Sequence, residues 1–280
     1  MTRRVTKGTL ITIAIWAALA ACGADWAVTA RAQDIVAHRG ASYDAPENTL
    51  AAFQLAWQQG ADGIEGDFHL TRDRQIVCFH DATAKRLTGI DRAISQMTLA
   101  EVRALDVGRW KGPQWAGARV PTLDEVLATV PADKYALIEI KCGPEIIPAL
   151  TEQLAAARLR PDQTRVIAFD ASVIAEVKRR LPKIKTHWLV GYRQDEQTGA
   201  WSPTRQEILA TLIETGADGV STSGNRQVVD AALAEAIRAR GLEFHVWTID
   251  DVADARYFQR LGADSLTTNR PSFLRNGLAR

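Results

Sequence analysis

Two histidines, one arginine and two closely spaced carboxylates fall within one short stretch of this chain. They are His38, Arg39, Glu65, Asp67 and His80. Histidine can accept or donate a proton near neutral pH, and the arginine guanidinium can hold a phosphate group through two parallel hydrogen bonds. These side-chain types together suit hydrolysis of a phosphate ester with the help of a metal ion.

A third carboxylate strengthens the case for a cation site. Glu139 and Lys141 lie two residues apart in a later apolar run, as Glu65 and Asp67 do in theirs, so each pair points to one face of a strand. Three carboxylates turned into one pocket repel, and each raises the pKa of the others. A divalent cation relieves that repulsion, and all-oxygen ligands favour Mg²⁺ or Ca²⁺ over zinc. Lys141 would add positive charge for a phosphate beside Arg39.

Other residues of the same types have simpler interpretations. The segment Pro46–Thr49 could be only a helix start, with Pro46 in the first helical position. His69 shares a face with the paired acids and is expected at the rim of the site. His187 and His245 are interpreted as structural histidines of the core. Trp247, at the end of a strand, would wall the pocket, although core packing is an alternative for it.

A repeated joint between helix and strand indicates the architecture. A glycine follows a helical pattern and precedes a short apolar run at Gly60–Ile64, Gly216–Val220 and Gly262–Leu266. Glycine just past a helix end supplies a left-handed cap, after which a strand can begin. Repeated joints of this kind favour βα units and a parallel sheet.

Counting the apolar runs gives eight strands, with Gln75–His80 as an extra strand beside the second. Eight βα units in about 250 residues predict a TIM (β/α)8 barrel. An open doubly wound sheet is the alternative, because strand number alone does not prove closure. The eight expected strands are Ile35–Arg39, Gly63–His69, Tyr135–Lys141, Arg165–Phe169, Thr186–Gly191, Gly219–Thr222, Glu243–Thr248 and Ser265–Thr268.

One connection, residues 82–122, is too long for a simple βα loop and forms an insertion after the second barrel strand. Long connections in compact α/β units are usually functional, so this one is expected to cap the pocket. Thr98 and Thr122 begin two capping boxes, each with a glutamate three residues later. Asp170 and Asp250 are expected to be helix N-caps.

The first 32 residues predict a targeting segment in front of a single domain at 33–280. Basic residues precede an apolar run, Leu10–Ala21. Two processing routes remain open. Ala30–Ala32 is a small-residue cleavage motif, whereas Leu19–Cys22 resembles a lipobox that would leave a lipid anchor on Cys22 at the membrane. Both routes predict export, to the periplasm or as an envelope lipoprotein.

The composition does not point to a nucleic-acid partner, and it offers few possibilities for disulfide bonds. Without residues 1–32 the chain carries 30 basic and 32 acidic residues, so no basic field points to nucleic acid. Three cysteines give no disulfide framework. Cys78 is expected to be a small core residue, and a bridge to Cys142 is a minor alternative.

Taken together, the motifs resemble those of the glycerophosphodiester phosphodiesterases. The resemblance runs from about Ile35 to Phe273, and that family has a TIM barrel with an insertion where residues 82–122 fall here. It implies hydrolysis of deacylated phospholipids to glycerol 3-phosphate and an alcohol. The matching motifs are His38–Gly40, Pro46–Thr49, Gly60–Asp67, Leu70–Thr71, His80–Asp81, Glu139–Lys141, Val246–Ile249 and Thr268–Pro271.

The resemblance also implies a role for each candidate residue. It gives acid–base roles to His38 and His80, metal ligation to Glu65, Asp67 and Glu139, phosphate contacts to Arg39 and Lys141, and substrate contacts to Phe169 and Trp247. The chain departs from the family pattern at three places. Gly66 replaces an aliphatic residue between the two acids, Ala168 stands where serine is common, and Ser221–Asn225 matches no family motif.

These features predict a metal-dependent phosphodiesterase that hydrolyses glycerophosphodiesters. A relative acting on lysophospholipids, or a phosphodiester lyase on the same site, is an alternative that Trp110 and Trp115 of the insertion would favour. A non-catalytic phosphodiester-binding envelope protein is a third possibility. It would need neither His38 nor His80 as acid and base, yet both are present with all three carboxylates.

Overall fold

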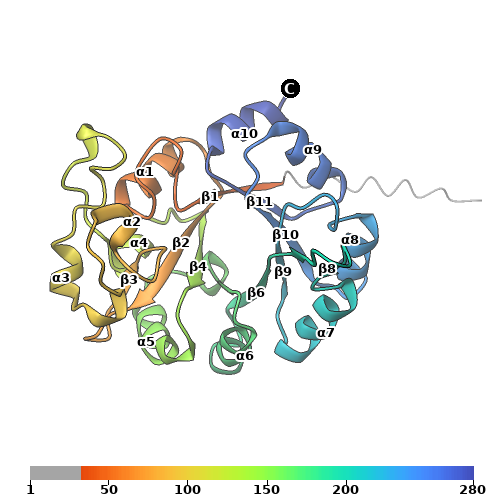
Figure 1. Ribbon diagram of the computed structural model, residues 1–280, viewed down its shortest axis with the longest axis horizontal. Helices are drawn as coiled ribbons and strands as arrows, with labels where there is room; N and C mark the ends of the chain where they lie inside the picture. The colour runs from red at the N-terminus through yellow and green to blue at the C-terminus, as the bar shows by residue number, and fades with distance from the viewer. Residues whose placement is uncertain (1–32) are drawn as a thin grey trace, which may run out of the picture. The chain divides into compact units, whose positions relative to one another are not determined.

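Eight parallel strands close into a barrel in the computed structural model, which describes residues 33–280 (Figure 1). Strand β1 pairs with β2 on one side and with β11 on the other, and this pairing closes the ring. The TIM barrel is therefore confirmed and the open sheet is excluded. The barrel strands are β1 (Asp34–His38), β2 (Gly63–Leu70), β4 (Tyr135–Ile140), β5 (Thr164–Ala168), β6 (Lys185–Val190), β9 (Gly219–Ser223), β10 (Glu243–Trp247) and β11 (Ser265–Thr268).

Helices ring the outside of the barrel (Figure 1) and follow the strands in chain order. Their glycine caps are left-handed as expected, with positive φ at Gly60, Gly216 and Gly262. None of the helices in residues 33–280 combines the length and apolar character needed to cross a membrane. The outer helices are α1 (Leu50–Gln58), α4 (Leu123–Leu127), α5 (Ile147–Ala156), α6 (Ala171–Arg180), α7 (Arg205–Thr215), α8 (Ala231–Arg238), α9 (Val252–Arg260) and α10 (Pro271–Leu278), with short 3₁₀ turns η3 (Pro144–Ile146) and η4 (Pro161–Gln163).

Two predicted helix starts are wrong. Pro46 is not in the first helical position, because α1 begins at Leu50 and Thr49 caps it by accepting a hydrogen bond from the Ala52 amide. The N-cap of α9 is Asp251, and Asp250 instead accepts hydrogen bonds from the segment after β11. The capping boxes at Thr98 and Thr122 and the cap at Asp170 are confirmed.

The insertion forms a small layer beside β2 with its own apolar core. Strand β3 (Ile76–Cys78) pairs antiparallel with β2, as expected. Buried side chains of the insertion, including Ile94 and Val102, pack with Phe79 as a cluster separate from the main core. Its helical segments are α2 (Lys85–Thr88), η1 (Ile94–Gln96), α3 (Leu99–Arg103) and η2 (Pro113–Trp115). Another hairpin, which was not predicted, follows β6 and consists of β7 (Arg193–Gln194) and β8 (Trp201–Ser202).

The barrel interior is layered along its axis. Val36, Leu137, Ile167 and Leu189 are buried together near mid-barrel. Polar side chains that also point into the barrel lie on both sides of this apolar layer. One polar group lies toward the carboxyl ends of the strands and the other toward their amino ends, so the apolar layer separates two polar regions.

The expectations for cysteine and for the first 32 residues have different outcomes. Cys78 and Cys142 are both free thiols, and Cys78 is a buried core residue. The targeting segment, both cleavage motifs and Cys22 lie outside the described residues and stay predictions.

Packing against α1 explains the unusual Gly66. A Cβ atom there would lie 3.1 Å from both the Cys78 sulfur and the Phe53 ring, and 3.3 Å from Phe68. The Phe53 ring and Cys78 therefore take the room that an aliphatic side chain would need. The glycine between the two acids compensates for bulky neighbours.

We expect Gly66→Val to lower the free energy of unfolding by about 1–3 kcal/mol, because it overpacks this contact. Adding Phe53→Leu should restore part of the loss in a double-mutant cycle measured by urea denaturation. Gly191→Ala is the control, since its new Cβ would make only an ordinary contact, 3.8 Å from Phe169. Equal losses with and without Phe53→Leu would show that Phe53 does not limit the space.

Candidate active site

The barrel brings all nine predicted site residues to the carboxyl ends of its strands. That end carries the active site in TIM-barrel enzymes, because the βα loops converge there. His38 is the last residue of β1, Glu65 and Asp67 lie in β2, Glu139 in β4 and Trp247 at the end of β10. His80, Lys141 and Phe169 follow β3, β4 and β5 directly.

These residues surround a cavity of about 150 Å³. Every predicted site residue lines it except Asp67, which is fully buried beside it. No residue of the insertion, 82–122, lines the cavity, so its predicted capping role is not seen. The complete lining is His38, Arg39, Glu65, His80, Glu139, Lys141, Ile167, Phe169, Leu189, Ser221, Trp247 and Thr267.

Three buried carboxylates converge at this end of β2 and β4. Oxygen atoms of Glu65, Asp67 and Glu139 lie within 4.8 Å of one another. Lys141 Nζ lies 2.6 Å from Glu139 and 3.4 Å from Asp67, and Arg39 Nε lies 3.2 Å from Asp67. Even so, one oxygen each of Glu65 and Asp67 is buried without a hydrogen-bond partner.

The charges of the three carboxylates are strongly coupled. Burial, followed by repulsion from Asp67, raises the pKa of Glu65 well above its usual value and that of Glu139 to about 7. Burial would also raise the pKa of Asp67, but Arg39 and Lys141 outweigh it, so that pKa is lowered. Buried carboxylate oxygens with no partner and unfavourable charge fit a hard divalent cation. The three acids would hold that ion.

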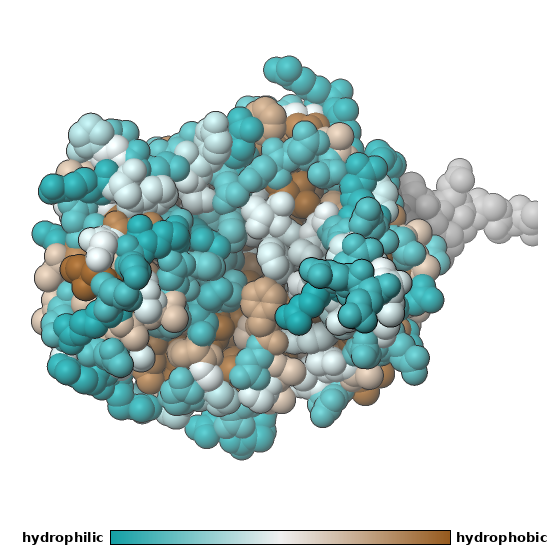
Figure 2. Space-filling model, viewed as in Figure 1, coloured by the Kyte–Doolittle hydropathy of each residue, from teal (hydrophilic) through white to brown (hydrophobic). Residues whose placement is uncertain are grey.

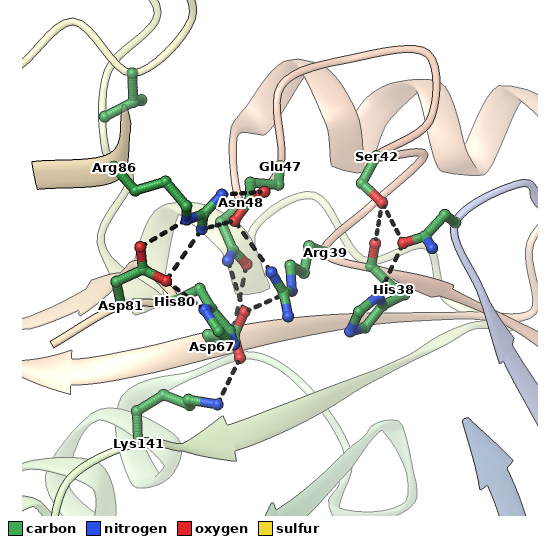
Figure 3. A network of polar contacts seen from close by, with 12 residues as sticks. His38, Arg39, Ser42, Glu47, Asn48, Asp67, His80, Asp81, Arg86 and Lys141 are labelled. Atoms are coloured by element: carbon green, nitrogen blue, oxygen red, sulfur yellow. Dashed lines mark hydrogen bonds and ion pairs between the residues drawn. The ribbon is translucent and has the colours of Figure 1, made fainter. Parts of the chain in front are cut away.

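Arg39 and Asn48 fix the acidic cluster from the β1–α1 loop. Both have left-handed backbones, with φ of 57°. The Arg39 amide donates to Glu65 at 2.9 Å, and its guanidinium reaches Glu47 at 3.1 Å. The Asn48 amide group donates to Asp67 at 2.7 Å (Figure 3). The segment considered as a simple helix start therefore also positions Asp67.

His38 is held by a residue from the other end of the chain. Its Nδ1 lies 2.8 Å from Oδ1 of Asn269, whose amide nitrogen donates to Asp250 at 2.6 Å. The carbonyl side of Asn269 therefore faces the ring and accepts from Nδ1–H, leaving Nε2 free as an acceptor. Burial, then the charge of Arg39, lowers the pKa of His38 to about 4, so the ring is neutral at pH 7.

His80 is held by a charged chain that reaches the insertion. Its Nδ1 lies 2.6 Å from Asp81, and Arg86 of α2 donates to both Asp81 and Glu47 (Figure 3). The backbone carbonyl of His80 also contacts His69 Nε2 at 3.2 Å. His69 thus supports the loop that carries His80, in keeping with its expected place at the rim.

Two aromatic side chains form one wall of the cavity. Phe169 and Trp247 meet edge to face, with ring centroids 5.6 Å apart. The indole of Trp247 donates to the Ser221 carbonyl at 3.0 Å, which fixes its orientation. Lys141 Nζ lies 5.9 Å from the Phe169 ring. This wall of the cavity is apolar, whereas the opposite wall carries charged side chains.

Sequence reasoning missed the residues that orient the histidines and acids. Motifs containing them were recognised, but only as markers of resemblance or as a helix start. Most of them find partners far along the chain that no local pattern encodes, whereas Asp81 contacts its neighbour His80. The missed residues are Glu47, Asn48, Asp81, Arg86, Asp250 and Asn269.

A closed barrel with this charged mouth defines a phosphodiesterase class, and comparison with known proteins agrees. Residues 38–273 match the model of the Glycerophosphoryl diester phosphodiesterase family. A glycerophosphodiester phosphodiesterase of Caldanaerobacter subterraneus subsp. tengcongensis is 33% identical over 247 residues, covering 86% of this chain and 96% of the relative. One from Bacillus subtilis is 28% identical, covering 84% and 83%.

Solved structures give the same result. An Oleispira antarctica phosphodiesterase, in complex with the product sn-glycerol-3-phosphate, is 27% identical with a TM-score of 0.78, covering 88% of this chain and 97% of that one. An Agrobacterium tumefaciens glycerophosphodiester phosphodiesterase is 28% identical with a TM-score of 0.71, covering 87% and 99%. This chain belongs to the glycerophosphodiester phosphodiesterase family and is an enzyme with that activity.

We expect Asn269→Ala to lower kcat by about 10²-fold, the lower end of what a general acid or base contributes. Loss of the carbonyl partner frees the His38 ring to rotate and to change tautomer, while KM should change little. Ser42→Ala is the matched control, because Ser42 Oγ lies 2.8 Å from the same Asn269 oxygen without contacting the ring. A similar kcat loss in both variants would contradict this role for Asn269.

Proposed function

We propose that this enzyme hydrolyses glycerophosphodiesters to glycerol 3-phosphate and an alcohol, with a divalent cation and the His38–His80 pair. The acidic cluster carries this proposal, because three buried carboxylates lie between the cationic side chains of Arg39 and Lys141. Glu65, which lines the cavity, keeps one buried oxygen without a hydrogen-bond partner. The product complex of the Oleispira relative supports the glycerol phosphate half of the substrate. The cavity is also small, which suits a deacylated substrate.

Glu65, Asp67 and Glu139 would hold Mg²⁺ or Ca²⁺. A bound ion of this kind offsets charge on the phosphate and lowers the pKa of a coordinated hydroxyl. Arg39 and Lys141 would bind the phosphate oxygens, Arg39 through its fork of donors and Lys141 as a point charge. The Phe169–Trp247 wall would pack against the glycerol or the alcohol group.

The two histidines would then divide the proton transfers. His38 is neutral and presents Nε2 as an acceptor, which suits it to take the proton of the glycerol 2-hydroxyl. His80 contacts Asp81, which orients its ring, and it would give a proton to the departing alcohol oxygen. The 2-hydroxyl oxygen bonds to phosphorus as the alcohol leaves, giving a cyclic 1,2-phosphate. Water would open this ring with the roles of the histidines reversed.

A lysophospholipid substrate has less support. Neither Trp110 nor Trp115 of the insertion lines the cavity. On the face shown in Figure 2, hydrophilic residues predominate and the hydrophobic ones are scattered. A long acyl chain would need a continuous apolar track that this face does not offer.

Chelation tests the cation. Exhaustive EDTA treatment should abolish release of glycerol 3-phosphate from glycerophosphocholine, and Mg²⁺ or Ca²⁺ should restore it. Glu139→Gln should weaken binding of the activating ion at least about tenfold, because one of the three ligand charges is gone. Glu152→Gln, on the exposed side of α5, should leave the metal dependence unchanged. Full activity after chelation would exclude the cation from the mechanism.

A substrate lacking the 2-hydroxyl tests internal attack. Replacing that hydroxyl by hydrogen should stop cleavage, because the internal nucleophile is gone. His38→Ala and His80→Ala should each lower kcat by at least about 10²–10⁴-fold, and the double variant should be little worse, since the two act as a unit. Brisk hydrolysis of the deoxy substrate would refute the cyclic route and favour direct attack by water.

A further inference from the structure

A second set of metal-ligating side chains lies at the opposite end of the barrel. In residues 33–280, His187 of β6 joins Glu243 and His245 of β10, with ligand atoms all within 4.8 Å of one another. Strand β9 runs between them, and its Gly219 pairs with both His187 and Glu243. Because Gly219 has no side chain, nothing separates the two imidazoles.

Both histidines aim the same ring nitrogen at one carboxylate oxygen. Nε2 of His187 lies 2.9 Å and Nε2 of His245 lies 3.3 Å from Oε2 of Glu243. The rings are stacked, with centroids 4.1 Å apart and planes inclined by 24°. In a tetrahedral site with zinc–ligand distances of about 2.0–2.1 Å, neighbouring ligand atoms are about 3.3 Å apart. The two distances from the ring nitrogens to the carboxylate oxygen, 2.9 and 3.3 Å, are close to that value.

The surroundings of His245 allow it to act as a metal ligand. Nδ1 of His245 lies 2.8 Å from Ser265 Oγ. If Nδ1–H donates to this hydroxyl, the Nε2 lone pair is available to a cation; if the hydroxyl donates to Nδ1 instead, Nε2–H donates to Glu243. Ligating histidines commonly have such a partner on the other ring nitrogen.

We infer that His187, Glu243 and His245 form a site for Zn²⁺, or a similar transition-metal ion, at the amino ends of the strands. Two imidazoles and one carboxylate suit zinc, whereas the all-oxygen cluster at the other end suits Mg²⁺ or Ca²⁺. The apolar layer of Val36, Leu137, Ile167 and Leu189 separates the two ends. The site would cross-link β6 to β10 without touching the substrate.

An ion can reach this site from solvent. Glu243 is only partly buried, and its second oxygen is ion-paired with Lys185, whose side chain is 47% exposed. The lysine holds the carboxylate in place while leaving Oε2 toward the histidines. It also reduces the negative charge of the site, so removing it should tighten zinc binding.

The test measures zinc itself. The full enzyme is stripped of metal and titrated with Zn²⁺ against a chromophoric chelator, and bound zinc is counted by mass spectrometry. Wild type should bind one zinc ion. Glu243→Gln and His187→Asn should each weaken that binding by at least about 100-fold. Ser265→Ala, which leaves all three ligands, should weaken it by roughly 10–100-fold, and Lys185→Met should strengthen it.

Glu139→Gln is the matched control for the other cluster and should keep this zinc. Glu243 and Lys185 are partly exposed, so their variants test the site even if the buried His187→Asn fails to fold. Hydrolysis of glycerophosphocholine with Mg²⁺ checks that the variants at positions 185, 187, 243 and 265 are folded, and circular dichroism checks Glu139→Gln. Absence of tight zinc in wild type, or zinc lost in Glu139→Gln but kept in Glu243→Gln, would overturn the inference.

Discussion

Repulsion among three buried carboxylates is the constraint on which the rest of the active site depends. Glu65, Asp67 and Glu139 share the end of two neighbouring strands, where burial raises the free energy of every negative charge. Arg39 and Lys141 offset part of that charge from either side. Glu65 keeps one buried oxygen without a hydrogen-bond partner, which would suit a hard cation.

The positions of those two cations follow from backbone geometry. Arg39 has a left-handed backbone immediately after β1, so its amide reaches Glu65 while its side chain reaches Asp67. Lys141 follows Glu139 by two residues, so strand alternation turns both into the barrel. Small displacements of either loop would leave a buried carboxylate without compensation, and such groups are strongly destabilising.

The histidines are positioned by different means, which suits different tasks. His38 contacts a neutral amide that is fixed by Asp250, and its pKa is lowered. His80 contacts a carboxylate that Arg86 of the insertion also holds. The insertion therefore acts at a distance from the cavity, by holding Asp81, and not as a lid. The apolar layer beneath isolates this chemistry from the polar amino end of the barrel.

The sequence by itself determined the strands and most helix caps, because these depend on local periodicity. Spacing of two residues indicated the acid pairs, and resemblance to a known family supplied the rest of the nine candidate residues, Phe169 among them. The sequence also indicated the hard character of the acid cluster. Only the tertiary structure decided barrel closure, the pairing of His38 with Asn269 across 231 residues, and the use of Asp250 as an anchor in place of a cap. Only the tertiary structure brings the rings of His187 and His245 into a stack. Contacts of this kind depend on strand register around a closed ring, and register is set by the packing of the whole barrel.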